Sequence, residues 1–161
     1  MTSFQLGGHY LKSALFLAHA SYAAYEDNPE TYKDFHHLKF DELIPFFSDP
    51  KKDGGATRGF LAEKKDAIVL AFRGTDMPSN MLSLQDWANS YRDWAINLNC
   101  KQVVDNGAKV HEGFVLALAS VWDKINEPLR KMVEQNKRKI WITGHSLGGA
   151  LATLATRRLL N

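Results

Sequence analysis

The fold is decided by the stretch Lys139-Ile140-Trp141-Ile142-Thr143-Gly144-His145-Ser146-Leu147-Gly148-Gly149-Ala150. It begins with an apolar run that is typical of a buried strand. The apolar positions after Ser146 recur at helical spacing, at Leu147, Ala150, Leu151 and Leu154. The stretch therefore predicts a strand, a tight turn that carries a serine, and a helix that runs to the chain end.

This strand-turn-helix context gives the serine a chemical meaning. In a nucleophile elbow the serine occupies a strained turn that lifts its hydroxyl clear of the sheet. Gly144 and Gly148, two positions away on either side of Ser146, leave room where larger side chains would collide. The helix start favours negative charge, so the amide of Leu147 is a natural oxyanion-hole donor. The alternative interpretation is a glycine-rich turn without chemical importance.

Upstream of this stretch, the sequence predicts the rest of an α/β sheet. Residues Ala67–Phe72 form a continuous apolar run that is typical of a central strand, and Thr57–Leu61 predicts another strand. Alternation of strands with helices favours a parallel sheet with flanking helices. We expect a single domain over residues 1–161.

Other segments give further expectations. An amphipathic helix near the N-terminus should end near Asp27-Asn28-Pro29. Its apolar face should consist of the residues that share one side at helical spacing: Leu11, Leu15, Ala18, Tyr22 and Tyr25. Four phenylalanines in the following stretch should pack in the core: Phe35, Phe40, Phe46 and Phe47. A short strand is expected within residues 103–110. The helix that begins near Phe114 should break or restart at Pro128, with Asn126 as its N-cap.

The composition narrows the class of protein. The 161 residues are 45% hydrophobic and carry a formal charge of +2 with acids and bases interspersed, which argues against a nucleic-acid partner. The single cysteine, Cys100, excludes an intrachain disulfide and fits a reducing compartment. We find no run long enough for a membrane span and no secretory signal, and therefore expect a cytoplasmic location.

Together with the serine turn, four further stretches carry a family resemblance: Ala18-His19-Ala20-Ser21-Tyr22-Ala23-Ala24-Tyr25, Ala71-Phe72-Arg73-Gly74-Thr75-Asp76, Asp93-Trp94-Ala95-Ile96-Asn97-Leu98 and Val110-His111-Glu112-Gly113-Phe114. With these motifs in this order, the sequence resembles the class 3 lipases, the fungal-lipase-like branch of the α/β-hydrolase fold. The resemblance covers most of the chain.

The resemblance implies a serine lipase or esterase that hydrolyses lipid esters of the acylglycerol type through an acyl-serine, with no metal or cofactor. Ser146 would be the nucleophile. Thr75 would hold the oxyanion by its backbone N–H and its hydroxyl, beside the Leu147 amide; the alternative for Thr75 is a simple turn threonine. Residues 77–95 would form a lid that opens at a lipid–water interface, or else a packed surface loop.

The sequence departs from the family after the serine. A serine nucleophile needs a base and an acid that orients it, in the order Ser, Asp or Glu, His, yet no His, Asp or Glu follows Ser146. His145 is expected to be a packed or hydrogen-bonded neighbour, and His111 to be structural or pocket-lining. Three interpretations remain: the N-terminal part of a longer lipase, which we favour; half of an enzyme that a second chain completes; or a non-catalytic module that binds lipid or protein.

Overall fold

The computed structural model describes residues 10–49, 51, 57–75, 101–105, 107–135 and 138–160. Its main sheet has four strands in the order β1-β2-β3-β6, with bounds Glu42–Phe47, Arg58–Lys64, Ala67–Phe72 and Lys139–Gly144. A separate two-stranded ribbon consists of β4 (Gln102–Asp105) and β5 (Ala108–His111). The helices are α1 (Tyr10–Ala23), α4 (Glu112–Gln135) and α5 (Leu147–Leu160), with short 3-10 turns at Pro29–Thr31 and Phe35–His37.

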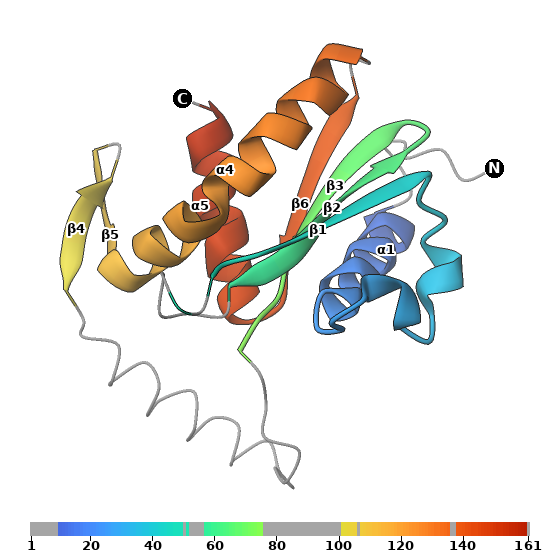
Figure 1. Ribbon diagram of the computed structural model, residues 1–161, viewed down its shortest axis with the longest axis horizontal. Helices are drawn as coiled ribbons and strands as arrows, with labels where there is room; N and C mark the ends of the chain where they lie inside the picture. Colours follow the sequence, from blue (N-terminus) through green and yellow to red (C-terminus); the bar gives the residue numbers. More distant parts are fainter. Residues whose placement is uncertain are drawn as a thin grey trace, which may run out of the picture.

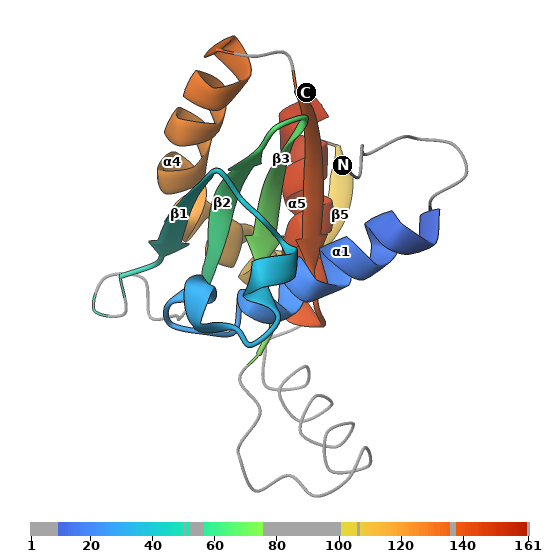
Figure 2. The same cartoon turned by 90° about the vertical axis from the view of Figure 1, so that its right-hand side faces the viewer.

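Helices cover both faces of the sheet. Figure 1 and Figure 2 show α4 and α5 on one face and α1 with the two short turns on the other. The alternation of side chains along β3 explains this arrangement, because successive residues point to opposite faces. Ile68, Leu70 and Phe72 belong to the core under α4 and α5, whereas Val69 and Ala71 belong to the core under α1. A strand buried on both faces must be apolar throughout, as β3 is.

The expected α/β fold is confirmed, and the strand predicted at Ala67–Phe72 has those bounds. The predicted strand at the serine turn is also present, as β6. The sheet is mixed, however, where a parallel one was predicted. β3 and β6 pair in parallel, but β1, β2 and β3 form an antiparallel meander. The polar turn at Lys65-Asp66 is short enough to reverse the chain directly, so no crossover helix intervenes between β2 and β3.

The predicted face of the N-terminal helix is wrong. Leu11 is 87% exposed, Leu15 61% and Tyr22 51%, and the helix instead buries Ala20 and Ala23 against the sheet. Small side chains let the helix approach the strands closely, so the alanine face packs inward although the larger residues also have helical spacing. Of the four phenylalanines, Phe46 is buried, Phe35 and Phe40 pack against the core under α1, and Phe47 is 62% exposed.

Two further expectations need correction. Helix α4 continues through Pro128 instead of breaking there, because the helix buries Ile125 before the proline and Leu129 and Met132 after it. Packing on both sides offsets the lost backbone hydrogen bond. The single strand expected in residues 103–110 is a hairpin, and Gly107 at its turn has a φ of +82°. A glycine adopts that conformation without steric cost.

Candidate active site

Ser146 occupies the turn between β6 and α5. Its φ is +55°, in the left-handed region that a residue with a side chain rarely adopts. The neighbouring backbone is tied by two hydrogen bonds, because the Gly148 amide donates to the His145 carbonyl and the Gly149 amide donates to the Ser146 carbonyl, both at 2.9 Å. The strain expected of a nucleophile elbow is therefore present at the serine itself.

The two glycines that flank the turn have no room for a side chain. A Cβ atom on Gly144 would lie 2.2 Å from the carbonyl oxygen of Gly148. A Cβ atom on Gly148 would lie 2.3 Å from the carbonyl oxygen of Phe72, at the end of β3. The turn thus packs backbone against backbone, and the first residues of α5 sit directly on the neighbouring strand.

Thr75 lies on the loop that leaves β3, beside the serine turn. The parallel register pairs Phe72 with Gly144, so the loop after β3 and the turn after β6 leave the same edge of the sheet. The Oγ1 atom of Thr75 is buried and has no hydrogen-bond partner among the described residues. A buried hydroxyl without a partner is costly, so such a group is expected where a ligand completes the bonding. This position and this unused donor suit an oxyanion contact.

The first turn of α5 supplies the other expected donor. Leu147 begins the helix, and the first amides of a helix have no partner within it. The bonds within the turn are donated by Gly148 and Gly149, one and two positions later. The Leu147 amide is therefore at the place where a helix start favours negative charge.

His145 is a hydrogen-bonded neighbour, as the sequence predicted. Its Nδ1 lies 2.9 Å from the hydroxyl of Tyr25, and its ring stacks on Tyr22 with 5.5 Å between the centroids. From the sequence, Tyr25 is predicted only as part of the first helix, and this contact is not. The signal that could have found it was the Tyr25 position within the family-like stretch at residues 18–25.

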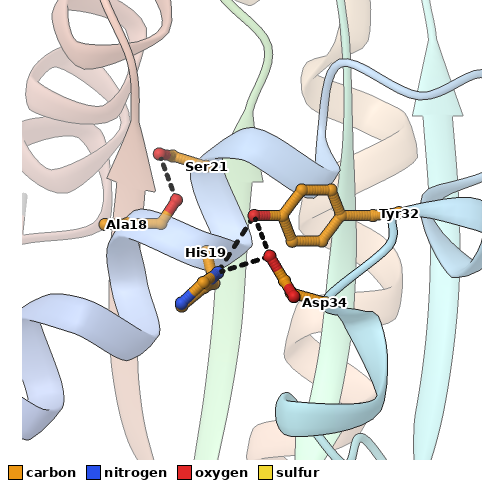
Figure 3. A network of polar contacts seen from close by, with 5 residues as sticks. All are labelled: Ala18, His19, Ser21, Tyr32 and Asp34. Carbon is orange, nitrogen blue, oxygen red and sulfur yellow. Dashed lines mark hydrogen bonds and ion pairs between the residues drawn. The ribbon is translucent and has the colours of Figure 1, made fainter.

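Two further histidines among the described residues, His19 and His111, have hydrogen-bond partners of their own. Nδ1 of His19 lies 3.0 Å from the Tyr32 hydroxyl and 4.0 Å from a carboxylate oxygen of Asp34. Figure 3 shows these three side chains together. Burial, and then the Asp34 carboxylate, raise the pKa of Tyr32 above its ordinary value of 10.0. His111 accepts a hydrogen bond from the Gly113 amide at 3.1 Å, at the start of α4. We find no hydrogen bond between the Ser146 side chain and a histidine in the described part of the chain.

Other parts of the expected site lie outside the described residues. These include the candidate lid at residues 77–95, with Asp76 and the Asp93-Trp94 motif. Across the ranges that are described, no cluster of three His, Cys, Asp or Glu side chains could hold a metal ion. No helix in those same ranges is both long enough and apolar enough to cross a membrane.

With this geometry established, comparison with known proteins identifies the family. The family described as Lipase (class 3) matches residues 69–161, which include β3, the Thr75 loop, β6 and the serine turn. The chain belongs to the class 3 lipase family. This class 3 lipase chain is 34% identical over 105 residues to a lipase of Rhizopus niveus, an alignment that covers 62% of this chain and 24% of that protein. It is 32% identical over 106 residues to the secreted mono- and diacylglycerol lipase A of Penicillium cyclopium, covering 64% of this chain and 32% of that protein.

Solved structures agree with the fold. The Lip2 lipase of Yarrowia lipolytica superposes with a TM-score of 0.63 at 26% identity, covering 91% of this chain and 53% of that one. The triacylglyceride lipase of Rhizomucor miehei gives a TM-score of 0.62 at 19% identity, covering 94% of this chain and 56% of that one. The class 3 lipase chain thus spans about half the length of these structures and about a third or less of the curated relatives it matches.

Proposed function

We propose that this chain carries the nucleophile and oxyanion hole of a serine lipase that hydrolyses carboxylic esters of lipids. The observation that carries the proposal is Ser146 in a left-handed turn between β6 and α5. A non-glycine residue is held in that conformation only when the surroundings enforce it, and such strain concentrates at catalytic groups. The proposed roles are Ser146 as nucleophile, with Thr75 and the Leu147 amide as oxyanion donors.

The reaction follows from these roles. The Ser146 oxygen adds to the ester carbonyl carbon, and the carbonyl electron pair moves onto oxygen, where Thr75 and the Leu147 amide donate hydrogen bonds. Collapse of this intermediate expels the alcohol and leaves an acyl-serine, which water then cleaves to the free acid. The serine proton must pass to a base and from there to the leaving alcohol.

We propose that this base, a histidine, and the acid that orients it come from residues outside this sequence. No histidine, aspartate or glutamate follows Ser146, and His19, His111 and His145 have hydrogen-bond partners other than the Ser146 hydroxyl. The source would be a further C-terminal segment or a second chain. Without a base, a serine hydroxyl is a weak nucleophile, so the chain alone should react slowly.

For the substrate, we propose acylglycerol-type lipid esters. The Penicillium cyclopium relative is named a mono- and diacylglycerol lipase, and other relatives are named lipases. In this proposal residues 77–95 form a lid over an acyl-chain site and open at a lipid–water interface. We also keep the predicted cytoplasmic location as a proposal, which fractionation of cells that express a tagged chain would check.

The test is reaction with a fluorophosphonate probe, which phosphonylates an activated serine. We expect slow covalent labelling of this chain, because its serine lacks a base, and none of the Ser146→Ala variant, with both proteins showing the same circular dichroism spectrum. Labelling that persists in Ser146→Ala would contradict Ser146 as the nucleophile. If the unaltered chain stays unlabelled even when imidazole is added as an external base, the proposed function is contradicted and the non-catalytic module considered from the sequence is favoured.

A further inference from the structure

Tyr25 reaches from the end of α1 to the residue that precedes the nucleophile. Its hydroxyl lies 2.9 Å from Nδ1 of His145. Its backbone is fixed by the last turn of the helix, since the Tyr25 amide donates to the Tyr22 carbonyl at 3.0 Å. Tyr22, one turn earlier, stacks on the same imidazole with an interplanar angle of 24°. The end of α1 therefore holds the His145 ring both at its edge and on its face.

The same tyrosine hydroxyl also limits the loop that carries Thr75. A Cβ atom on Gly74 would lie 2.2 Å from the Tyr25 oxygen and 2.5 Å from the His145 carbonyl oxygen. Gly74 is thus wedged between the tyrosine and the serine turn, and no side chain fits there. Tyr25 contacts both halves of the proposed site, the elbow through His145 and the oxyanion loop through Gly74.

Helix α1 is itself anchored to β6, so the tyrosine does not stand on a loose element. The Thr143 hydroxyl, three residues before Ser146, donates to the Leu17 carbonyl at 3.1 Å. The alanine face of α1 is buried against the sheet at Ala20 and Ala23. A rigid support of this kind is what a precisely spaced pair of catalytic loops requires, because small misplacements of reacting groups cost large factors in rate.

We propose that Tyr25 is a positioning residue for the ester hydrolysis proposed for this chain. Its hydroxyl holds the His145 ring through the hydrogen bond at Nδ1 and holds the spacing between the Thr75 loop and the Ser146 turn. This inference rests on the proposed function, since the spacing matters for catalysis only if Ser146 and Thr75 act together.

The test compares Tyr25→Phe with Tyr22→Phe, which removes a hydroxyl one turn away on the same helix and keeps the ring that stacks on His145. We expect Tyr25→Phe to lower the rate of Ser146 phosphonylation by about 10- to 100-fold. The ¹⁵N resonance of His145 Nδ1 should shift, because the variant lacks the hydroxyl that bonds to that nitrogen. Tyr22→Phe should leave both the rate and this resonance as in the unaltered chain.

The midpoint of urea unfolding, measured for both variants, separates positioning from stability. A Tyr25→Phe variant that labels as fast as Tyr22→Phe, with unaltered His145 resonances, would overturn the proposal. If the unaltered chain is not labelled even with imidazole added as an external base, the proposed function fails. The ¹⁵N resonance of His145 Nδ1 and the amide resonances of Thr75 and Ser146 then decide whether Tyr25 positions the two loops. Movement of these resonances in Tyr25→Phe alone would support the positioning claim, and unaltered resonances would refute it.

Discussion

Gly144 and Gly148 approach so closely that a Cβ atom on the first would lie 2.2 Å from the carbonyl oxygen of the second. The obstacle is backbone, which cannot rotate away as a flexible side chain can. The space on either side of Ser146 is therefore fixed by the turn itself and not by the side chains around it.

We predict that Gly144→Ala lowers the free energy of unfolding by more than about 3 kcal/mol, because it forces the turn to open. Gly149→Ala is the matched control. A Cβ atom there would lie 3.3 Å from the Gly144 carbonyl oxygen, and alanine is favoured by about 1 kcal/mol over glycine within a helix. Urea unfolding measures the free energy of unfolding of both variants. Equal losses would show that the close approach of Gly144 to Gly148 is not the cause of the destabilisation.

Thr75→Val should separate stability from reactivity. The substitution replaces a buried hydroxyl that has no partner among the described residues with a methyl group of similar shape. We expect the free energy of unfolding to stay the same or to rise by about 1 kcal/mol. Phosphonylation of Ser146 should slow by about 100-fold, as is typical for the loss of one oxyanion donor. Thr75→Ser should restore the rate, and a Thr75→Val variant that labels normally would remove the hydroxyl from the mechanism.

Helix α4 offers a matched pair of leucines. Leu118 is 1% exposed within the core under α4 and α5, whereas Leu116, two residues earlier, is 63% exposed. Leu118→Ala should cost about 2–5 kcal/mol, since it removes buried methyl groups and leaves a cavity. Leu116→Ala should change the free energy of unfolding by less than about 0.5 kcal/mol. Chemical denaturation measures the free energy of unfolding of both variants. Equal losses would contradict the described orientation of α4.

Pro128 lies within α4, where a proline costs about 3 kcal/mol relative to alanine. We expect Pro128→Ala to stabilise the protein by about 1–3 kcal/mol, because it restores a backbone donor and removes a clash with the preceding turn. Pro29→Ala is the control, and we expect it to change the free energy of unfolding in the opposite direction. Pro29 begins a 3-10 helix, where its fixed φ suits the fold, and its loss should destabilise by about 0.4–1 kcal/mol. Thermal unfolding measures the stability of both variants. If both substitutions raised, or both lowered, the melting temperature, these opposite roles of Pro128 and Pro29 would be refuted.

Tyr32 gives a prediction for alkaline pH. Its pKa is raised in the folded protein by burial and then by the Asp34 carboxylate, so the folded state holds the phenol proton more tightly than the unfolded state. The resulting stabilisation is fully present below pH 10.0, the ordinary pKa, and is lost as the pH rises through the folded pKa. Phenolate absorbance should show a late-titrating tyrosine that disappears in Tyr32→Phe. In Asp34→Asn this tyrosine should titrate at a lower pH. An unchanged titration would exclude the Asp34 carboxylate as a cause of the raised pKa of Tyr32.

Much of the fold could be predicted because its signals are local. A continuous apolar run gave the bounds of β3, and the serine between two glycines located the turn after β6. Strand β1 was missed because Pro45 lies within it and obscures its pattern. The structure places β1 at the edge of the sheet, where a proline is tolerated. The hairpin was missed because the Asn106-Gly107 pair was not recognised as a turn signal.

The site was less predictable, because its contacts join residues far apart in the sequence. Ser146 and Thr75 could be named from motifs, but the contact between Tyr25 and His145 depends on how α1 packs against β6. The face of α1 could not be assigned from periodicity, since its alanines and its larger apolar residues both recur at helical spacing. Which face turns inward is decided by how closely the helix must approach the strands.

The parallel pairing of β3 with β6 has a consequence for the order of folding. Ala67 pairs with Lys139, so this ladder must close a loop that contains everything between residues 68 and 138. The antiparallel meander of β1, β2 and β3 closes much shorter loops and can form earlier, since local contacts cost less chain entropy. During synthesis the meander would therefore stand for some time with one side of β3 unpaired. The turn that carries Ser146 would reach the Thr75 loop only when this long loop closes.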